Sequence, residues 1–227
     1  MAVVMSKAKT IWNILASLLI MAGFALGTTS LFLKLDLAKT LPEPLIVSVI
    51  SLVAISAGAL FLILIEAHIS HALVLGTSRL SRMVTWGLLG GCAISLVNFP
   101  YRSLTEQIVV PEEFIIELNA GVPVIVVYLF LSIIVLPIVE EIYFRGLLYR
   151  LIKNSFDIFW GFALSTMLFV VGHEFSRPEH IFWMVINSAV LTYVYHKTNS
   201  ALASAIAHSF WSLTWFSTYY AAHLGWF

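Results

Sequence analysis

The residues that could do chemistry in this sequence begin with two adjacent glutamates inside an apolar segment. Glu140 and Glu141 follow Leu136-Pro137-Ile138-Val139, and Arg145 comes four residues after Glu141. Residues four apart lie on one face of a helix, so Glu141 and Arg145 can pair. Glu140 lies about 140° around the helix from Arg145 and is left without that partner. An unpaired carboxylate in an apolar setting holds a proton more readily than in water, which suits a general base.

Two histidines further along the chain could complete a site. His173 ends one apolar segment, and His208 lies inside another. Neutral imidazole is a common metal ligand, and a protonated ring nitrogen can donate a hydrogen bond to an oxyanion. The stripe around His208 is small and polar, so this histidine faces other helices rather than lipid. The stripe consists of Ala201, Ser204, Ala205, His208 and Ser212.

Each of these features has a structural alternative. Glu140, Glu141 and Arg145 could form a salt-bridge network at a helix end, and a single histidine on an apolar helix is usually a packed core residue. His68 and His71 with Glu66 are interpreted as an interfacial cluster. The sequence contains no H-E-x-x-H, G-x-S-x-G or P-loop motif, which argues against a zincin, a serine hydrolase and an NTPase.

The composition defines the setting of these residues. Of the 227 residues, 60% are apolar and 11% are charged, and twelve basic residues balance twelve acidic ones. A soluble domain cannot bury this much apolar surface, and disordered chains are poor in apolar residues. Without a basic excess, nucleic acid is not an expected partner. The composition therefore predicts an all-α, polytopic transmembrane helix bundle that forms a single domain over residues 1–227.

About seven spans are expected, within a range of six to eight. The first is interpreted as an uncleaved anchor, and the third contains a G-x-x-x-G spacing from Gly87 to Gly91 that favours close helix packing. Cys92 in the same span is expected to be a buried, inert thiol. A short amphipathic surface helix is expected within Tyr101–Ala120. The spans are Ile11–Leu33, Leu45–Ile65, Met83–Val97, Val122 to about Lys153, Ile158–His173, Ile181–Tyr195 and Ala201 to about Ala221.

The fourth span is overlong and carries the charges. Three ionisable residues at mid-membrane cost about 8–10 kcal/mol, and the twelve large apolar residues before them return about 4–7 kcal/mol. The charges therefore lie near the inner interface or are offset by partners. Helix lengths from the expected inner turns allow Glu140, His173 and His208 to meet only if helices tilt or begin late.

Basic residues set the expected orientation. With the N-terminus inside, eight Lys and Arg residues lie on the inner side and four on the outer side, which favours a cytoplasmic N-terminus. A small multi-pass chain without an organelle signal is expected in a prokaryotic plasma membrane.

Taken together, the motifs resemble the CPBP family, which comprises CAAX proteases and bacteriocin-processing enzymes, is also called Abi, and includes the CAAX prenyl endopeptidases. The similarity covers Val122 to about Thr218, the expected catalytic half, and rests on Glu140-Glu141-x-x-x-Arg145, Phe169-x-x-x-His173 and His208. It implies an intramembrane endopeptidase that cleaves a membrane-associated peptide or protein in or near the bilayer.

The resemblance also implies roles for single residues. Glu140 would activate water, Glu141 and Arg145 would hold the site, and His173 and His208 would ligate a metal or stabilise the oxyanion. Two kinds of site stay open. One holds zinc with Glu140, His173 and His208, and the other is a metal-free, glutamate-type site. We expect the metal-free one, because two imidazoles are a thin ligand set.

The sequence departs from the family pattern at Ser212, where Asn or Asp is usual. This departure motivates an alternative, a non-catalytic membrane scaffold or an immunity or maturation factor of the same fold. A small transporter that uses a buried carboxylate as a proton relay is a third candidate, although no pair of broken half-helices is evident.

Overall fold

The computed structural model describes residues 6–36, 41–65, 78–105, 115, 121–173 and 178–226. The regular elements within them are helices, as expected for the all-α class. Seven helical rods correspond to the seven expected spans. They are α1 (Lys7–Lys34), α2 (Glu43–Ile65), α4 (Leu80–Thr105), a composite rod over Val122–Ser155, α9 (Ile158–Val171), α10 (Pro178–Thr198) and α11 (Ala201–His223).

Four of these rods are long and apolar enough to cross a membrane, namely α1, α2, residues Leu80–Asn98 of α4, and the composite rod. α9 is apolar but shorter, with 14 residues. α10 and α11 bury polar side chains inside the bundle, which lowers their hydropathy. The chain is therefore a helical membrane protein with a polar interior.

Tyr101–Thr105 continue α4, and the rest of the expected amphipathic helix lies, except for Ile115, outside the described residues, as do Glu66, His68 and His71. The expectation that Cys92 is buried is wrong, because α4 turns its glycines toward α11 and leaves Cys92 exposed.

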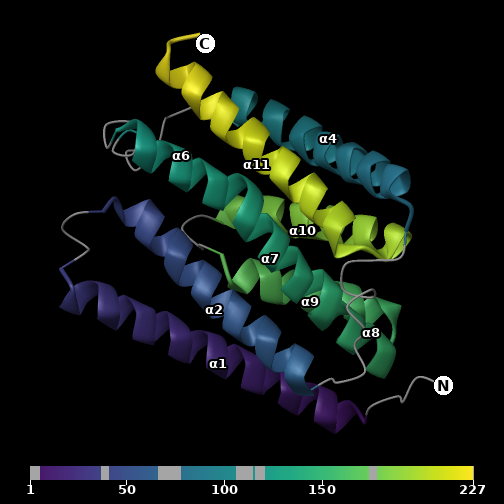
Figure 1. Cartoon of the computed structure of the whole chain (residues 1–227). Coiled ribbons are helices and arrows are strands. Elements are labelled where there is room, and N and C mark those ends of the chain that lie inside the picture. The colour runs from purple at the N-terminus through teal and green to yellow at the C-terminus, as the bar shows by residue number, and fades with distance from the viewer. Residues whose placement is uncertain are drawn as a thin grey trace.

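The composite rod runs through the middle of the molecule (Figure 1). It consists of α6 (Val122–Phe130), η2 (Leu131–Val135), α7 (Leu136–Glu141), η3 (Ile142–Tyr149) and α8 (Arg150–Ser155). The pair α1–α2 lies on one side and the pair α4–α11 on the other, and α2 and α11 both contact the rod (Figure 1). The rod is thus enclosed by helices from both halves of the chain.

Glycines let α4 and α11 approach closely, as the G-x-x-x-G spacing predicts. A Cβ added to Gly87 would come within 2.7 Å of Ile206, and one added to Gly91 within 2.7 Å of Phe210. Small residues at such positions are the common way for membrane helices to gain van der Waals contact, since lipid gives little hydrophobic driving force. This packing holds the helix of His208 in place.

The composite rod contains two π-helical segments, η2 and η3. Pro137 explains the first, because its missing N–H removes one backbone bond and its ring crowds the carbonyl of the preceding turn. The wider turn relieves that crowding, and Leu136 N–H bonds the carbonyl of Leu131 five residues earlier. In η3, all residues from Tyr143 to Tyr149 are buried. Other helices therefore surround this segment, which includes Arg145, on every side.

Polar contacts between helices fix the neighbours of the rod. The hydroxyls of Tyr143 and Ser17 share a hydrogen bond of 2.9 Å that joins η3 to α1. Asn98 on α4 donates to Asn187 on α10 over 2.9 Å. Both contacts are buried, where water cannot replace them, so they specify how the helices pack.

Candidate active site

A buried ion pair forms the centre of the candidate site. Arg145 Nη1 donates to Glu141 Oε1 over 2.8 Å, and both side chains are 0% exposed. This is the contact that the four-residue spacing predicts. Arg145 Nη2 also donates to the hydroxyl and the carbonyl oxygen of Ser188 on α10, over 2.8 and 3.2 Å. Hydrogen-bonding partners therefore offset the cost of burying these two charges.

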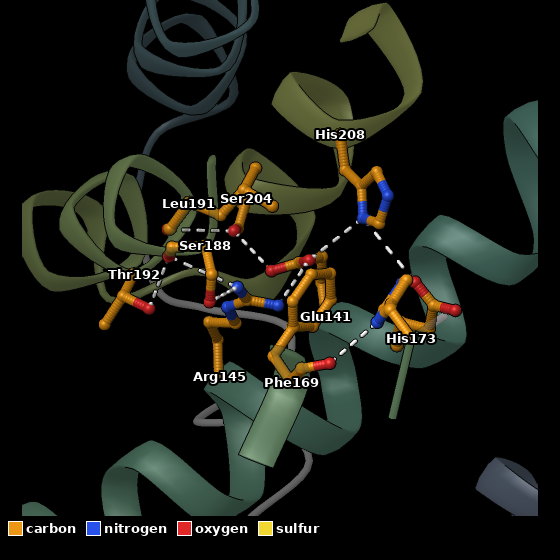
Figure 2. Close-up of polar contacts among 10 residues, drawn as sticks. Glu141, Arg145, Phe169, His173, Ser188, Leu191, Thr192, Ser204 and His208 are labelled. Atoms are coloured by element: carbon orange, nitrogen blue, oxygen red, sulfur yellow. Dashed lines mark hydrogen bonds and ion pairs between the residues drawn. The ribbon is translucent and has the colours of Figure 1, made fainter. Parts of the chain in front are cut away.

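Two residues of α11 complete the surroundings of the Glu141 carboxylate (Figure 2). Ser204 donates its hydroxyl to Oε2 over 2.5 Å, and His208 Nδ1 lies 3.1 Å from Oε1. With Arg145, three side chains thus bind this one carboxylate. Glu141 links the composite rod to α11 and has little capacity left to act on a substrate.

The Ser204 hydroxyl gives a stability prediction. Ser204→Ala removes a buried hydrogen bond to a charged acceptor, so we expect the free energy of unfolding to fall by about 1.5–3 kcal/mol. Thermal or denaturant unfolding in detergent measures the effect. Thr214→Val, which removes a part-buried hydroxyl bond between α11 and Ser95 on α4, is the matched control and should cost less. Equal losses in the two variants would show that the charged acceptor adds nothing.

Glu140 is in a different environment from Glu141. Its side chain is 13% exposed, and its Oε2 lies 3.8 Å from His208 Nδ1. The hydrogen bonds of Arg145 go to Glu141 and Ser188 instead. Of the two adjacent carboxylates, Glu141 is enclosed and paired with a cation, and Glu140 stays partly exposed.

His208 is held in one orientation by its neighbours. Its ring stacks on Trp211, with centroids 5.2 Å apart and planes 24° apart. An ionised carboxylate only accepts hydrogen bonds, so Nδ1 carries the proton that faces Glu141. The other ring nitrogen points away from Glu141 (Figure 2). When both ring nitrogens are protonated, the charges of Glu140, Glu141, Arg145 and His208 sum to zero.

The Phe169 ring joins His173 to the rest of the site. It lies 4.2 Å from the ring of His173 and 6.0 Å from that of His208, centroid to centroid. The Arg145 guanidinium carbon lies 4.3 Å from the Phe169 ring centre, a cation–π contact. His173 Nδ1 lies 2.7 Å from the Phe169 carbonyl, which can only accept, so Nδ1 is protonated and Nε2 is the nitrogen left for other chemistry.

The structure thus brings the predicted residues together to different degrees. Glu141, Arg145 and His208 are in direct contact, Glu140 lies beside His208, and His173 is linked to them through Phe169. From the sequence, Phe169 is known only as the first residue of the Phe169-x-x-x-His173 motif, and Ser188 is not indicated as a partner. An aromatic four residues before a histidine is a weak signal for such a contact, and Ser188 offers no signal at all.

The arrangement does not fit a three-ligand metal site. Among the described residues, no three His, Cys, Asp or Glu side chains are gathered closely enough to hold a metal ion. Nδ1 is engaged in both His173 and His208, so Nε2 is the ring nitrogen that each could offer to a substrate or a metal. The chemistry proposed below therefore has no step that passes through a metal, and zinc ligation by Glu140, His173 and His208 stays a prediction from the resemblance.

Metal dependence can be tested directly. We expect purified active protein to hold far less than one metal per chain, and 1,10-phenanthroline to leave its activity unchanged. Elemental analysis by mass spectrometry, run on the same sample as the activity assay, gives the answer. Stoichiometric zinc that disappears in both His173→Ala and His208→Ala would reject the metal-free expectation.

Ser212 is half-buried one turn beyond His208. Within the described part of the chain it makes no hydrogen bond to any of the five predicted site residues. The polar group expected at this position from the family pattern is therefore not replaced by the serine hydroxyl.

Fold and site together define a helical membrane protein with a buried glutamate–arginine–histidine constellation. Residues 122–214 match the family described as type II CAAX prenyl endopeptidase Rce1-like, a protease family. This match confirms the resemblance predicted from the motifs and covers the composite rod and most of α9–α11. Neither the curated proteins nor the solved structures gave a match.

Proposed function

We propose that this protein is an intramembrane endopeptidase in which Glu140 activates water. The contrast between the two glutamates carries the proposal. Glu141 is 0% exposed and bound by three side chains, whereas the Glu140 side chain is 13% exposed and is not among the hydrogen-bond acceptors of Arg145 in the described structure. A general base must accept a proton from a water molecule that can reach it, and of the two glutamates Glu140 is the one with a partly exposed side chain.

The proposed step is hydrolysis of a peptide bond. Glu140 takes a proton from water, and the water oxygen bonds to the peptide carbonyl carbon to give a tetrahedral oxyanion. Protonated His208 and His173 donate hydrogen bonds to that oxyanion, each worth roughly 2.7–4 kcal/mol in the transition state. Glu140 then gives its proton to the leaving nitrogen as the carbon–nitrogen bond breaks. Both histidines must carry a proton on Nε2, because their Nδ1 atoms are already engaged.

The proposed substrate is a membrane-associated peptide or protein. The matched family is named for CAAX prenyl endopeptidase activity, so a prenylated C-terminal peptide is the first probe. A buried site in a helix bundle favours substrates that partition into the bilayer before they bind. The lipid bilayer is therefore a proposed partner in addition to the peptide substrate. Nucleic acid is not an expected partner.

Purified protein in lipid nanodiscs tests the proposal. A farnesylated CAAX peptide and an unprenylated apolar peptide are each incubated with it in H₂¹⁸O. We expect cleavage of at least one peptide, with one solvent oxygen in the new carboxyl terminus by mass spectrometry. Binding of both peptides without cleavage would contradict the proposal and support the alternative below.

A non-catalytic scaffold or an immunity or maturation factor of the same fold is the alternative. Ser212 favours it, because within the described residues the serine hydroxyl makes no hydrogen bond to the five predicted site residues. In such a protein, Glu140→Gln would leave peptide binding unchanged, and neither the wild type nor the variant would cleave the peptide. An endopeptidase would lose turnover on that change and keep binding.

We propose a plasma membrane of a prokaryote as the location, with the N-terminus in the cytoplasm. The support is the distribution of basic residues, since those at the start of α1, the start of α4 and the ends of α8 and α10 share one end of the bundle. Such an excess of Lys and Arg is typical of cytoplasmic loops. Labelling of cysteines introduced at either end of α1 would test the orientation.

A further inference from the structure

The end of the bundle that contains the start of α1 gathers positive charge outside the candidate active site. Arg82 donates to the carbonyl of Lys197 over 2.7 Å, and Lys7 lies over the ring of Phe156. Among the described residues, the acid at this end is Asp157, whose carboxylate caps α9 by accepting from Trp160 N–H. We call this region the basic end, and its cationic residues are Lys7, Lys9, Arg79, Arg82, Arg150, Lys153 and Lys197.

Two polar atoms are buried there without a hydrogen-bond partner in the described structure. One is Nη1 of Arg150 on α8, and the other is the hydroxyl of Tyr195 on α10. Tyr195 is 1% exposed, and the Arg150 charge acts on its hydroxyl. Buried N–H and O–H groups are nearly always satisfied, so two such donors that interact electrostatically indicate that an acceptor binds between them.

The surroundings of these atoms select an anion as that acceptor. The Lys153 ammonium lies 5.5 Å from the centre of the Tyr149 ring, whose centroid is 5.6 Å from that of Tyr195. Arg150 and Lys153 act on each other electrostatically, and no carboxylate of the described residues pairs with either. A water molecule could accept the two hydrogen bonds, but it would leave this positive charge uncompensated. An oxyanion would accept both hydrogen bonds and also compensate the positive charge.

The position of these residues along their helices indicates which anion the cluster would bind. Arg150 and Lys153 occupy the last turns of the composite rod, and Tyr195 lies one turn before the end of α10. Helix ends of this kind lie at the level of lipid headgroups, where phosphate is the abundant anion. The Tyr149 hydroxyl is already engaged with His196 Nδ1 over 2.6 Å, so Tyr195 is the free hydroxyl of this cluster.

We propose that Arg150 and Tyr195 form a binding site for a phosphoryl oxyanion at the basic end of the bundle. The guanidinium and the phenol donate to the phosphate oxygens, and Lys153 adds charge. Anionic phospholipid headgroups and free inorganic phosphate share this chemistry. The site is separate from Glu140 and does not depend on the proposed peptidase activity.

Binding of phosphatidylglycerol to the full chain, measured by native mass spectrometry from detergent, tests the site. We expect Arg150→Gln and Tyr195→Phe each to weaken binding by about ten-fold or more, the effect of one charge-assisted hydrogen bond. Lys9→Gln removes the same charge from an exposed position and should leave binding unchanged. Tyr195→Phe keeps the ring packed on Tyr149, so it reports on the hydroxyl even if Arg150→Gln folds poorly.

The source of the phosphate is resolved by competition. Displacement of the lipid by millimolar inorganic phosphate would assign the site to free phosphate, and its persistence would assign the site to the headgroup. Either result supports the proposed chemistry if the two variants lose binding. Equal binding of phosphatidylglycerol by the wild type, Arg150→Gln, Tyr195→Phe and Lys9→Gln would overturn the proposal.

Discussion

Glu140→Gln is expected to lower turnover of a cleaved peptide by about 10²–10⁴-fold, the usual contribution of a general base. The amide keeps the shape of the side chain but cannot accept the proton from water. Folding should be retained, because Glu140 takes no part in the bonds among Arg145, Glu141, Ser188 and Ser204. Initial rates at saturating peptide, with the melting temperature of the same sample, measure both effects.

Two comparisons make this result specific. Glu43→Gln removes the same charge from an exposed position at the start of α2 and should leave turnover unchanged. Peptide binding to Glu140→Gln should stay close to that of the wild type, because the loss falls on the chemical step. Wild-type turnover in a well-folded Glu140→Gln protein would remove Glu140 from the mechanism.

Glu141→Ala is expected to lower the free energy of unfolding by about 3–5 kcal/mol, since it leaves a fully buried guanidinium without its carboxylate. Both side chains are 0% exposed, and Arg145 keeps only the Ser188 hydroxyl and carbonyl as acceptors. Poor expression and a lower melting temperature should precede any kinetic effect. Reversible unfolding in mixed micelles gives the number.

A double-mutant cycle separates the pair from its parts. Arg145→Met should cost a similar amount, because it leaves the Glu141 carboxylate buried without its cation. Glu141→Leu with Arg145→Met removes both charges and should cost less than the sum of the single changes, with a coupling of about 0.5–3 kcal/mol. Strict additivity would show that the two side chains do not stabilise each other.

Several features could be predicted from local sequence because they depend on residues that are close along the chain. The spacing of Glu141 and Arg145 predicts their pairing on one helix face, and the structure places them 2.8 Å apart. The same geometry separates Glu140 from Arg145. The Gly87–Gly91 spacing predicts close packing, and α11 supplies the partner surface.

Other features depend on how helices pack against each other, so the sequence could not predict them. Arg145 contacts Ser188, 43 residues away, and Glu141 contacts Ser204, 63 residues away. A serine inside an apolar helix looks alike whether its hydroxyl bonds its own backbone or a buried charge. The expectation that Cys92 is buried fails for the same reason, since a residue's exposure depends on which face of its helix meets a neighbour.

The sequence by itself determined that this chain forms membrane helices and that Glu141 pairs with Arg145. It also determined that Glu140 lies on another face of the helix, outside that pair. Each depends on composition or on the repeat of a single helix. Only the tertiary structure decided that His208 lies against both glutamates, that Phe169 links His173 to Arg145, and that Ser188 and Ser204 complete the buried charges. Those contacts join helices whose relative tilt and depth arise from packing of the whole bundle, which no local pattern encodes.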